Sequence, residues 1–420
     1  MKELIHTLGN GLRVICMPMD TPVVYCGYQI KAGSRNEAPG YDGLAHFCEH
    51  MTFKGTGRRS AGIILNSLEK VGGSLNAYTN KEDTTFYASV MSAYATRAID
   101  LLTDMVFNSV YPQREIDKEV EVICDEIESY NDSPADLIYD EYENVLFAGH
   151  PLGHNILGTA GRVRLFTTAD ALRFTRRYYR PSNAVFFIAG DMLPNGCLRG
   201  HRKPVTAMLE TALAKYCPNP AADEADYWEA KNVALSPAPP LLTHDRHTHQ
   251  AHVMVGSRAF DFNDPRRTAL SLLNNIIGGP GMNARLNIVL REHRGLVYTV
   301  ESSMAAYSDT GVWTTYLGCD TKDIRRCLYL IRRELDRLCA RPLTETRLKA
   351  AKRQLKGQIG IACDNHENYA LDAARYFLFR NRAYDISEQF RAIDGVTAEQ
   401  LQQVAREVFK PEGMTTLIYQ

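Results

Sequence analysis

Two halves of the sequence present the same elements in the same order. The segment 23–30, rich in β-branched and aromatic residues, predicts a strand that leads through a loop into a helix at 43–55. Roughly 225 residues later, the segment 250–260 predicts a strand that leads into the apolar helix 268–277. Because matching elements recur in matching order, we expect a duplicated unit that contains both helices and strands, which assigns the chain to the α+β class.

A second pair of segments extends the duplication toward the end of each half. Thr168 begins a predicted helix in the first half, and Thr397 begins one in the second half. Each helix is followed by a basic residue and a proline, at Pro181 and Pro411. We therefore expect the two halves to be related along most of their length.

The chain is long enough for two hydrophobic cores, at 420 residues. Prolines interrupt polar and acidic residues over 218–240, a composition typical of a linker. The sequence therefore predicts a first domain at 1–217, a linker at 218–240 and a homologous second domain at 241–420.

The helix predicted at 43–55 carries titratable side chains in an otherwise apolar segment. His46 and His50 lie one turn apart on one face, and Glu49 lies beside them. Burying these groups costs several kcal/mol unless a partner compensates them. Neighbouring side chains would satisfy two core histidines, whereas a divalent metal ion would satisfy both rings and leave a water for Glu49 to deprotonate. The order His-x-x-Glu-His is the inverzincin motif, so we favour the metal interpretation.

The second half lacks this motif at the corresponding positions. When the two predicted strands are aligned, the residues opposite the motif are Leu270, Leu273 and Asn274. Leucine side chains offer no metal ligand, so we expect the metal site in the first domain alone.

A third ligand is expected from the acidic helix at 116–130, because a hydrolytic zinc site takes three protein ligands and keeps one position for water. Glu119 and Glu126 each precede a member of the apolar stripe and lie seven residues apart, so they share one flank beside the buried face. Helix geometry does not choose between them. Cys48 is a possible fourth ligand, but it lies two residues from each histidine and points to another face of its helix.

Composition narrows the class of protein. A net charge of -1 gives no electrostatic footprint for nucleic acid or an anionic membrane, and no apolar run approaches the length of a transmembrane helix. The ten cysteines are scattered without a Cys-x-x-Cys pair, so we expect reduced thiols in a reducing compartment. Because the N-terminal segment shows no signal-peptide core, we expect the protein in the cytoplasm.

Four histidines lie near the predicted start of the second domain: His244, His247, His249 and His252. On a strand, His247 and His249 would share one face. No carboxylate or cysteine accompanies the four at a fixed spacing, so we interpret the segment as a partly exposed strand start and not as a second metal site.

Short motifs along the whole chain carry a resemblance to a known family. They are Gly55-Thr56, Asn131-Asp-Ser-Pro134, His150-Pro-Leu-Gly153, Gly158-Thr159, Tyr179-Arg-Pro-Ser-Asn183 and Phe409-Lys-Pro411. Together with the His-x-x-Glu-His motif, they resemble the pitrilysin family of zinc peptidases, in particular the short two-domain members related to mitochondrial processing peptidase. The resemblance implies two homologous domains, each a mixed and mostly antiparallel sheet flanked by helices, which face each other as a clamshell around a closed chamber.

The resemblance also implies roles for individual residues. Glu126 stands at the family's spacing from His50 and would be the third zinc ligand, with Glu119 as an auxiliary acid seven residues earlier. Asn76 and Ala77 resemble the family's edge strand, which pairs with an extended peptide substrate.

In the second half, Arg291 and Tyr298 resemble a family pair that reaches the zinc site, holds the substrate and stabilises the tetrahedral intermediate. Taken alone, they would be interpreted as a helix-capping arginine and a tyrosine packed at a strand start. Because the chain carries both the metal helix and this pair, the resemblance implies a self-sufficient zinc endopeptidase for peptides or unfolded segments, which forms a homodimer. The alternatives are a catalytically silent or partner-dependent subunit of the same family, and a metal-binding scaffold protein.

Overall fold

The computed structural model describes residues 3–217 and 235–420. The chain divides into two compact units, each assembled from three stretches of sequence. The first unit comprises Met1–Glu128, Asn155–Val233 and Ala362–Tyr384, and the second comprises Ser129–His154, Ala234–Ile361 and Asp385–Gln420.

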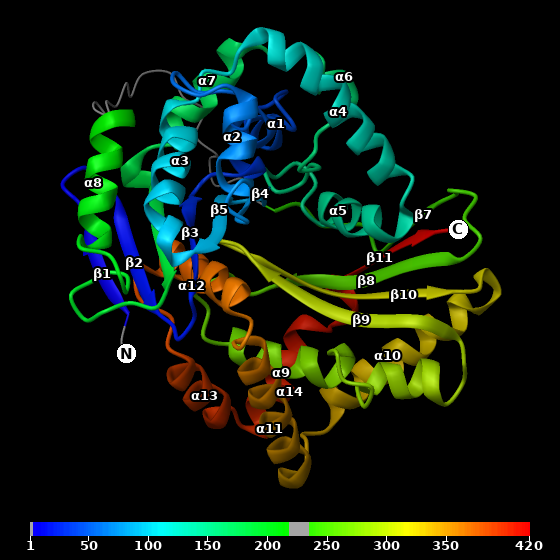
Figure 1. Cartoon of the computed structure of the whole chain (residues 1–420). Helices are drawn as coiled ribbons and strands as arrows, with labels where there is room; N and C mark the ends of the chain where they lie inside the picture. The colour runs from blue at the N-terminus through cyan, green and yellow to red at the C-terminus, as the bar shows by residue number, and fades with distance from the viewer. Residues whose placement is uncertain (1–2, 218–234) are drawn as a thin grey trace. The chain divides into compact units, whose positions relative to one another are not determined.

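The first unit is built on a six-stranded sheet (Figure 1). Its strands are β1 (Leu4–Thr7), β2 (Arg13–Pro18), β3 (Val23–Ile30), β4 (Ser74–Thr79), β5 (Thr84–Met91) and β6 (Ala184–Gly190). Their order across the sheet is β1-β2-β6-β3-β5-β4, with β2 and β6 parallel and the other neighbours antiparallel. Strand β4 therefore occupies one edge of the sheet.

Helices from the first half of the sequence cover one face of this sheet. They are α1 (Leu44–Thr52), α2 (Ala61–Glu69), α3 (Ala95–Asn108), α4 (Gln113–Asn131), α6 (Ala160–Val163), α7 (Thr168–Tyr178) and α8 (Val205–Tyr216). In the core beneath them, the rings of Tyr28 and Phe186 are fully buried and meet edge to face, with centroids 4.9 Å apart. Helix α1 is buried on nearly all sides, as its apolar sequence predicts.

The second unit is built on a five-stranded sheet. Its strands are β7 (Leu241–His244), β8 (Ala251–Ala259), β9 (Val297–Ala306), β10 (Gly311–Cys319) and β11 (Met414–Tyr419). Their order is β7-β11-β8-β10-β9, with β7 and β11 parallel and the other neighbours antiparallel. The helical segments from this half are α9 (Arg267–Gly278), the π-helical η4 (Asn287–Glu292), α10 (Ile324–Ala340), α11 (Glu345–Ala362), α13 (Ile386–Gly395) and α14 (Ala398–Val408).

The topology of the two sheets confirms the predicted duplication. Strands β2 to β6, taken in chain order, occupy the same positions as β7 to β11, and the parallel pair β2 and β6 corresponds to the parallel pair β7 and β11. The matching helices α7 and α14 both begin with a capping box, at Thr167 and Thr397. The first of these helices begins at the predicted Thr168, whereas the second begins at Ala398, one residue after the predicted Thr397.

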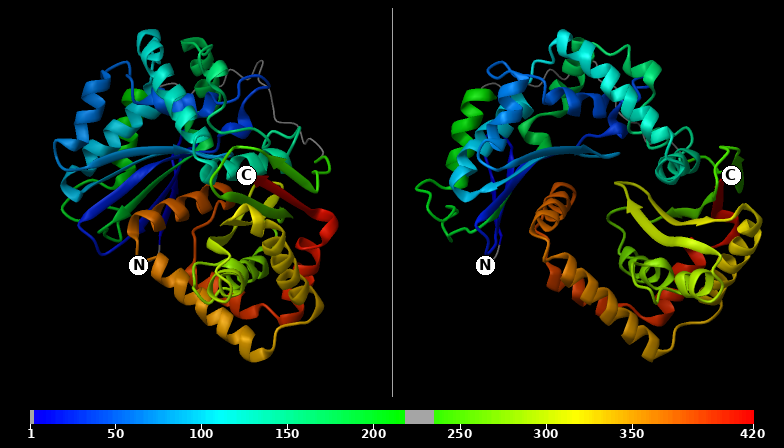
Figure 2. Two further views of the ribbon diagram at one scale, coloured as in Figure 1. Left: turned by 90° about the vertical axis from the view of Figure 1, so that its right-hand side faces the viewer. Right: turned by 45° about the vertical axis from the view of Figure 1, so that its right-hand side comes forward.

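One helix in each unit comes from the opposite half of the sequence. Helix α5 (Pro134–Leu146) packs on β8 and β11 of the second sheet, whereas α12 (His366–Arg380) packs on β2, β3 and β6 of the first sheet (Figure 2). Tyr142 of α5 is fully buried, and its hydroxyl donates a hydrogen bond of 3.1 Å to the carbonyl oxygen of Thr415. The compact units consequently depart from the predicted ranges 1–217 and 241–420 at these two helices.

This exchange has a physical reason, because each sheet has a second apolar face. In the first sheet, Val185 and Phe187 point away from the main core, and they pack with Phe377 of α12 in a separate hydrophobic cluster. Met254 and Leu417 of the second sheet form the equivalent cluster with residues of α5. Each exchanged helix therefore covers apolar surface that the helices of the other half leave open.

Part of the predicted linker, residues 218–234, lies outside the described residues, and β7 begins at Leu241. None of the helices within 3–217 and 235–420 is long and apolar enough to cross a membrane.

Candidate metal centre

The start of helix α1 is held by contacts with neighbouring loops. Gly43 adopts a left-handed conformation with a φ of +95°, and a Cβ at this position would lie 2.7 Å from the carbonyl oxygen of Leu157. The carboxylate of Glu37 accepts hydrogen bonds from the backbone N–H groups of Gly43 and Ala45, at 3.0 and 2.7 Å. Because the first turn of a helix leaves such donors unpaired, these bonds fix where α1 begins and therefore where its histidines lie.

The two histidines of α1 meet a glutamate of α4. The rings of His46 and His50 lie with their centroids 4.6 Å apart. The Nε2 atom of His46 is 3.7 Å from Oε1 of Glu126, and Nε2 of His50 is 3.2 Å from Oε2 of the same carboxylate. The structure therefore brings together the three residues that the sequence predicted as metal ligands.

This donor set fits a catalytic zinc ion. One ligand atom from each of His46, His50 and Glu126 lies within 4.8 Å of the others. Bonds of about 2.0–2.1 Å in a tetrahedral site place neighbouring ligand atoms roughly 3.3–3.5 Å apart, close to the two separations from Glu126. The Glu126 side chain is 45% exposed, so solvent reaches the site. Cys48 does not belong to this close group, and its fully buried Sγ lies 4.0 Å from the carbonyl oxygen of Ala171 on α7.

The two imidazoles have opposite protonation preferences. Burial, together with the nearby His50, lowers the pKa of His46 to about 4. Burial also lowers the pKa of His50, but hydrogen bonds with Glu119 and Glu126 outweigh burial and raise this pKa to about 9. His46 is therefore neutral and ready to bind a metal ion at pH 7, whereas His50 must first release a proton.

Glu119 lies behind His50 and is itself paired with a lysine. Its Oε1 is 3.1 Å from Nδ1 of His50, and its Oε2 is 2.5 Å from Nζ of Lys54. Burial raises the pKa of Glu119, but the contacts with His50 and Lys54 outweigh burial and lower it. Sequence reasoning found Glu119 and missed Lys54, although its position one turn after His50 was the signal that would have identified it.

Glu49 lies beside the histidines and is held by a residue that the sequence analysis also missed. Its side chain is buried, and Oε2 accepts a hydrogen bond of 2.5 Å from the hydroxyl of Thr79, at the end of β4. Burial raises the pKa of Glu49, whereas the Thr79 hydroxyl and His50 lower it. The predicted substrate-binding residues Asn76 and Ala77 lie earlier on the same edge strand.

Arg291 and Tyr298 lie in the second unit and face one another. The guanidinium carbon of Arg291 is 5.9 Å from the centroid of the Tyr298 ring, and both residues line a cavity of about 390 Å³. The Tyr298 side chain is 79% exposed, so it is not packed into the core at a strand start. The predicted reach of this pair toward the metal ligands of the first unit stays a prediction.

Known proteins resemble this chain over its full length. Residues 14–160 match the family described as "Insulinase (Peptidase family M16)", and residues 166–355 match "Peptidase M16 inactive domain". An uncharacterized zinc protease of Bacillus subtilis (strain 168) is 30% identical over 419 residues, which cover 98% of this chain and 97% of the relative. The chain belongs to peptidase family M16.

A further relative agrees with this assignment, and a solved structure shows the same fold. The beta subunit of the mitochondrial-processing peptidase of Rattus norvegicus is 29% identical over 411 residues, which cover 95% of this chain and 81% of the subunit. The crystal structure of a protease from Helicobacter pylori superposes with a TM-score of 0.86 at 22% identity and covers 100% of this chain and 99% of that one. These findings confirm the predicted family and the predicted fold of two sheets flanked by helices.

The residues that the sequence alignment places opposite the motif have structural roles in the second half. Leu270 and Leu273 are buried in the core. Asn274, the third, accepts a hydrogen bond of 3.0 Å from Nε1 of Trp313 and donates one of 3.0 Å to the carbonyl oxygen of Ser302. In the alignment, Asn274 of the second half therefore makes structural hydrogen bonds where the first half has the proposed metal ligand His50.

The four histidines near the start of the second unit are dispersed. Nδ1 of His252 lies 2.9 Å from the hydroxyl of Tyr316, and His247 is 89% exposed beside Asp245. Within the described part of the chain, none of the four joins a close group of potential metal ligands. This arrangement agrees with the interpretation of the segment as a partly exposed strand start.

Proposed function

We propose that this M16 protein is a zinc-dependent endopeptidase. The observation that carries the proposal is the convergence of His46, His50 and Glu126, with ligand atoms within 4.8 Å of one another and the carboxylate of Glu49 on the same helix as the two rings. The names of the relatives, which are zinc proteases, support zinc as the metal. When bound, the zinc ion would polarise the scissile carbonyl group and lower the pKa of a bound water.

The protein residues around the metal would divide the remaining work. Glu49 would accept a proton from the attacking water and deliver it to the leaving amine, as the general base and then the general acid. Its raised pKa supports this role, because a carboxylate with a raised pKa accepts a proton more readily near neutral pH. Glu119 would hold the ring of His50 through Nδ1, which keeps Nε2 directed at the metal.

Strand β4 supports an extended polypeptide as the substrate. It lies at the edge of its sheet, with Asn76 exposed and Ala77 half-buried. An extended peptide that pairs with such an edge gains main-chain hydrogen bonds with little dependence on side chains. We propose that peptides or unfolded segments bind here inside a closed chamber, as the family resemblance implies.

We further propose that the chain works as a homodimer that needs no unlike subunit. The presence in one chain of the metal-ligand set and of the Arg291 and Tyr298 pair supports this proposal, because a guanidinium and a phenol would stabilise the developing oxyanion. All ten cysteines are unpaired, which supports a reducing compartment such as the cytoplasm. Light scattering coupled to size-exclusion chromatography would measure the mass, and a monomer would contradict the dimer.

A Glu49→Gln variant tests the proposed function. We expect the variant to keep its bound zinc, measured by elemental analysis, and to lose cleavage of a set of fluorescence-quenched peptides. Glu69→Gln, which changes an exposed glutamate of α2 in the same unit, is the matched control and should cleave like the wild type. If the zinc-loaded wild type cleaves none of the peptides, the alternative of a catalytically silent or partner-dependent subunit replaces this proposal.

A further inference from the structure

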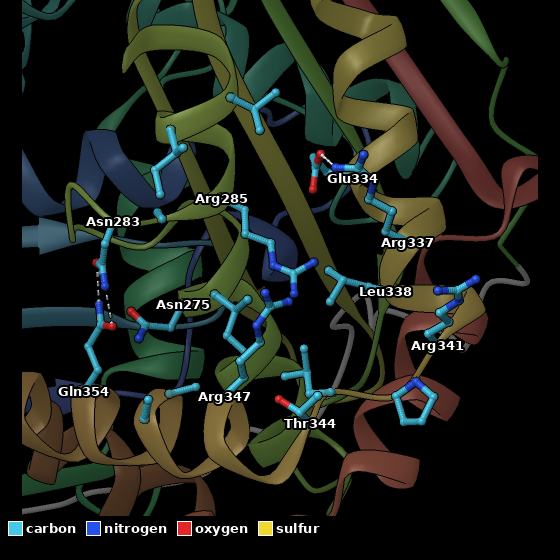
Figure 3. A pocket seen from close by; sticks show the side chains of 18 of the residues that line it. Asn275, Asn283, Arg285, Glu334, Arg337, Leu338, Arg341, Thr344, Arg347 and Gln354 are labelled. Carbon is cyan, nitrogen blue, oxygen red and sulfur yellow. Dashed lines mark hydrogen bonds and ion pairs between the residues drawn. The ribbon is translucent and has the colours of Figure 1, made fainter. Parts of the chain in front are cut away.

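The second unit contains a cavity of about 990 Å³. It is lined by four arginines, whereas the cavity beside Tyr298 is lined by one, Arg291. Four segments surround the larger cavity: the C-terminal part of α9, the turn that leads into η4 with the start of η4, the C-terminal end of α10, and the N-terminal part of α11 (Figure 3). Its volume lies at the upper end of the range for small-molecule sites, about 300–1,000 Å³. None of its lining residues takes part in the proposed peptidase chemistry.

Arginine side chains dominate the polar part of this cavity. Arg285, Arg337, Arg341 and Arg347 line it, with Glu334 as the only acidic residue among the lining residues. Glu334 is buried and pairs with Arg337 at 2.5 Å. Within the described part of the chain, the other three arginines form no ion pair of their own, and four guanidinium groups face one carboxylate, so the cavity carries an excess of positive charge.

Two of the unpaired arginines approach one another. Figure 3 shows the side chains of Arg285 and Arg347 pointing toward each other across the cavity. Arg285 is half-buried; burial lowers its pKa, Glu334 offsets part of this effect, and Arg347 and Arg337 lower the pKa further. The two positive charges repel one another. An anion bound between them would form a charge-assisted hydrogen bond with each guanidinium group and offset this repulsion.

The uncharged part of the lining includes polar side chains, among them Asn275 and Gln354, and a set of apolar ones. Ile276, Ile288, Val289, Leu338 and Leu343 contribute to its lining. A site for a bare inorganic ion has no use for such a surface, whereas a ligand with an anionic end and an apolar body would use both parts. The planar guanidinium group donates two parallel hydrogen bonds that match the oxygen geometry of phosphate and carboxylate groups. Three such groups without an ion pair favour a ligand with more than one negative charge.

We propose that this cavity binds a small organic phosphate with at least two negative charges. The phosphate oxygens lie between Arg285 and Arg347, with Arg341 at the rim, and the organic part lies against Ile288 and Leu338. A flexible acidic peptide fits less well, because the surface is concave and only Arg285 and Arg347 point toward one another. The proposal does not rest on the proposed peptidase activity, because neither the metal ligands nor Arg291 and Tyr298 line this cavity.

Titration calorimetry on the full-length, zinc-loaded protein tests the proposal with ADP, pyrophosphate, citrate, adenosine and a polyglutamate peptide as probes. We expect ADP to bind more tightly than pyrophosphate and adenosine to bind weakly or not at all. The double variant Arg285→Gln/Arg347→Gln should weaken ADP binding by roughly tenfold or more, and Arg347→Lys, which keeps the charge without the fork, should give an intermediate loss. Arg353→Gln, an exposed arginine elsewhere on α11, is the matched control and should bind like the wild type.

A bound zinc ion can attract phosphate by itself, so ADP could bind at the zinc site instead of in this cavity. The arginine variants distinguish the two sites. Binding of ADP that is unchanged in the double variant would assign it elsewhere and overturn the proposal. Equal or tighter binding of citrate would identify a carboxylate site and overturn the choice of phosphate, and a preference for a polyglutamate peptide would identify a peptide-docking surface instead. Circular dichroism checks the fold, and the single variant Arg347→Gln, at an exposed position, tests the same contact with ADP if the double variant does not fold.

Discussion

The hydroxyl of Thr79 donates a hydrogen bond of 2.5 Å to Oε2 of Glu49. Thr79 is the last residue of the edge strand β4, whereas Glu49 lies between the two histidines of α1. A single contact therefore joins the strand proposed to pair with the peptide to the carboxylate proposed to move the proton. The position of the base relative to a bound peptide depends on this contact, because the peptide would be aligned by β4.

Replacing Thr79 by valine tests the importance of this contact. The substitution keeps the size and branching of the side chain but removes the donor to a charged group, whose hydrogen bonds contribute about 1.5–3 kcal/mol. We expect kcat for a quenched peptide to fall by roughly tenfold or more, while the zinc content stays the same. Thr211→Val on α8, whose hydroxyl donates a hydrogen bond to the carbonyl oxygen of Ala207 on the same helix, is the control. An unchanged kcat in Thr79→Val would show that Glu49 is oriented by other groups.

Lys54 should affect the metal without touching it. Its Nζ lies 2.5 Å from Glu119, which in turn holds Nδ1 of His50 at 3.1 Å. In Lys54→Met, the pKa of Glu119 would rise and its hold on the His50 ring would weaken. We expect zinc affinity to fall by about tenfold, which is the lower end of the effect of losing such supporting contacts. Competition with a chelator of known affinity measures the change.

The control for this variant is Lys70→Met, at the C-terminal end of α2 and exposed. It removes the same charge from the same unit and should leave zinc affinity unchanged. If both variants lose affinity equally, the effect comes from the net charge of the unit and not from the chain of contacts through Glu119.

Zinc affinity should depend on pH through His50. Its pKa is raised to about 9, above the ordinary value of 6.5, so the metal-free protein holds this proton throughout the neutral range. His46 is already neutral above pH 5, because its pKa is lowered to about 4. Zinc uptake must therefore release about one proton per ion, and affinity should rise about tenfold per pH unit between pH 6.5 and 9.

Calorimetry in buffers of different ionisation enthalpy measures the number of protons released. A Glu119→Gln variant should release fewer protons at pH 7.5, because it removes one of the contacts that raise the pKa of His50. Affinity that is flat over this range would show that His50 is neutral before zinc binds.

The sequence predicted the local features of this protein well, because they depend on residues close in the chain. The face shared by His46 and His50 follows from helical periodicity alone. The flank shared by Glu119 and Glu126 follows in the same way. The structure places both carboxylates next to His50, Glu126 as a candidate metal ligand and Glu119 as a supporting contact. Periodicity had left the choice between them open, since both lie on that flank.

The features that the sequence did not predict depend on tertiary contacts. The apolar faces of α5 and α12 indicate burial, but they do not say which sheet each helix will cover, so the exchange of these helices between the units was missed. The contact between Thr79 and Glu49 was missed for a similar reason. A strand pattern shows which face a side chain takes, and it does not show which helix lies opposite.

Tyr298 offers a test that separates a catalytic role from a structural one. Its side chain is 79% exposed beside Arg291, so loss of the hydroxyl should cost little stability. We expect Tyr298→Phe to melt within about 1 °C of the wild type and to retain zinc, with kcat/KM lower by roughly ten- to a hundredfold because an oxyanion donor is lost. Tyr329→Phe, at a position that is 64% exposed on α10, is the matched control and should leave kcat/KM unchanged. A lower melting temperature with unchanged kcat/KM would instead make Tyr298 a packing residue, and the oxyanion contact would then have to come from the first unit.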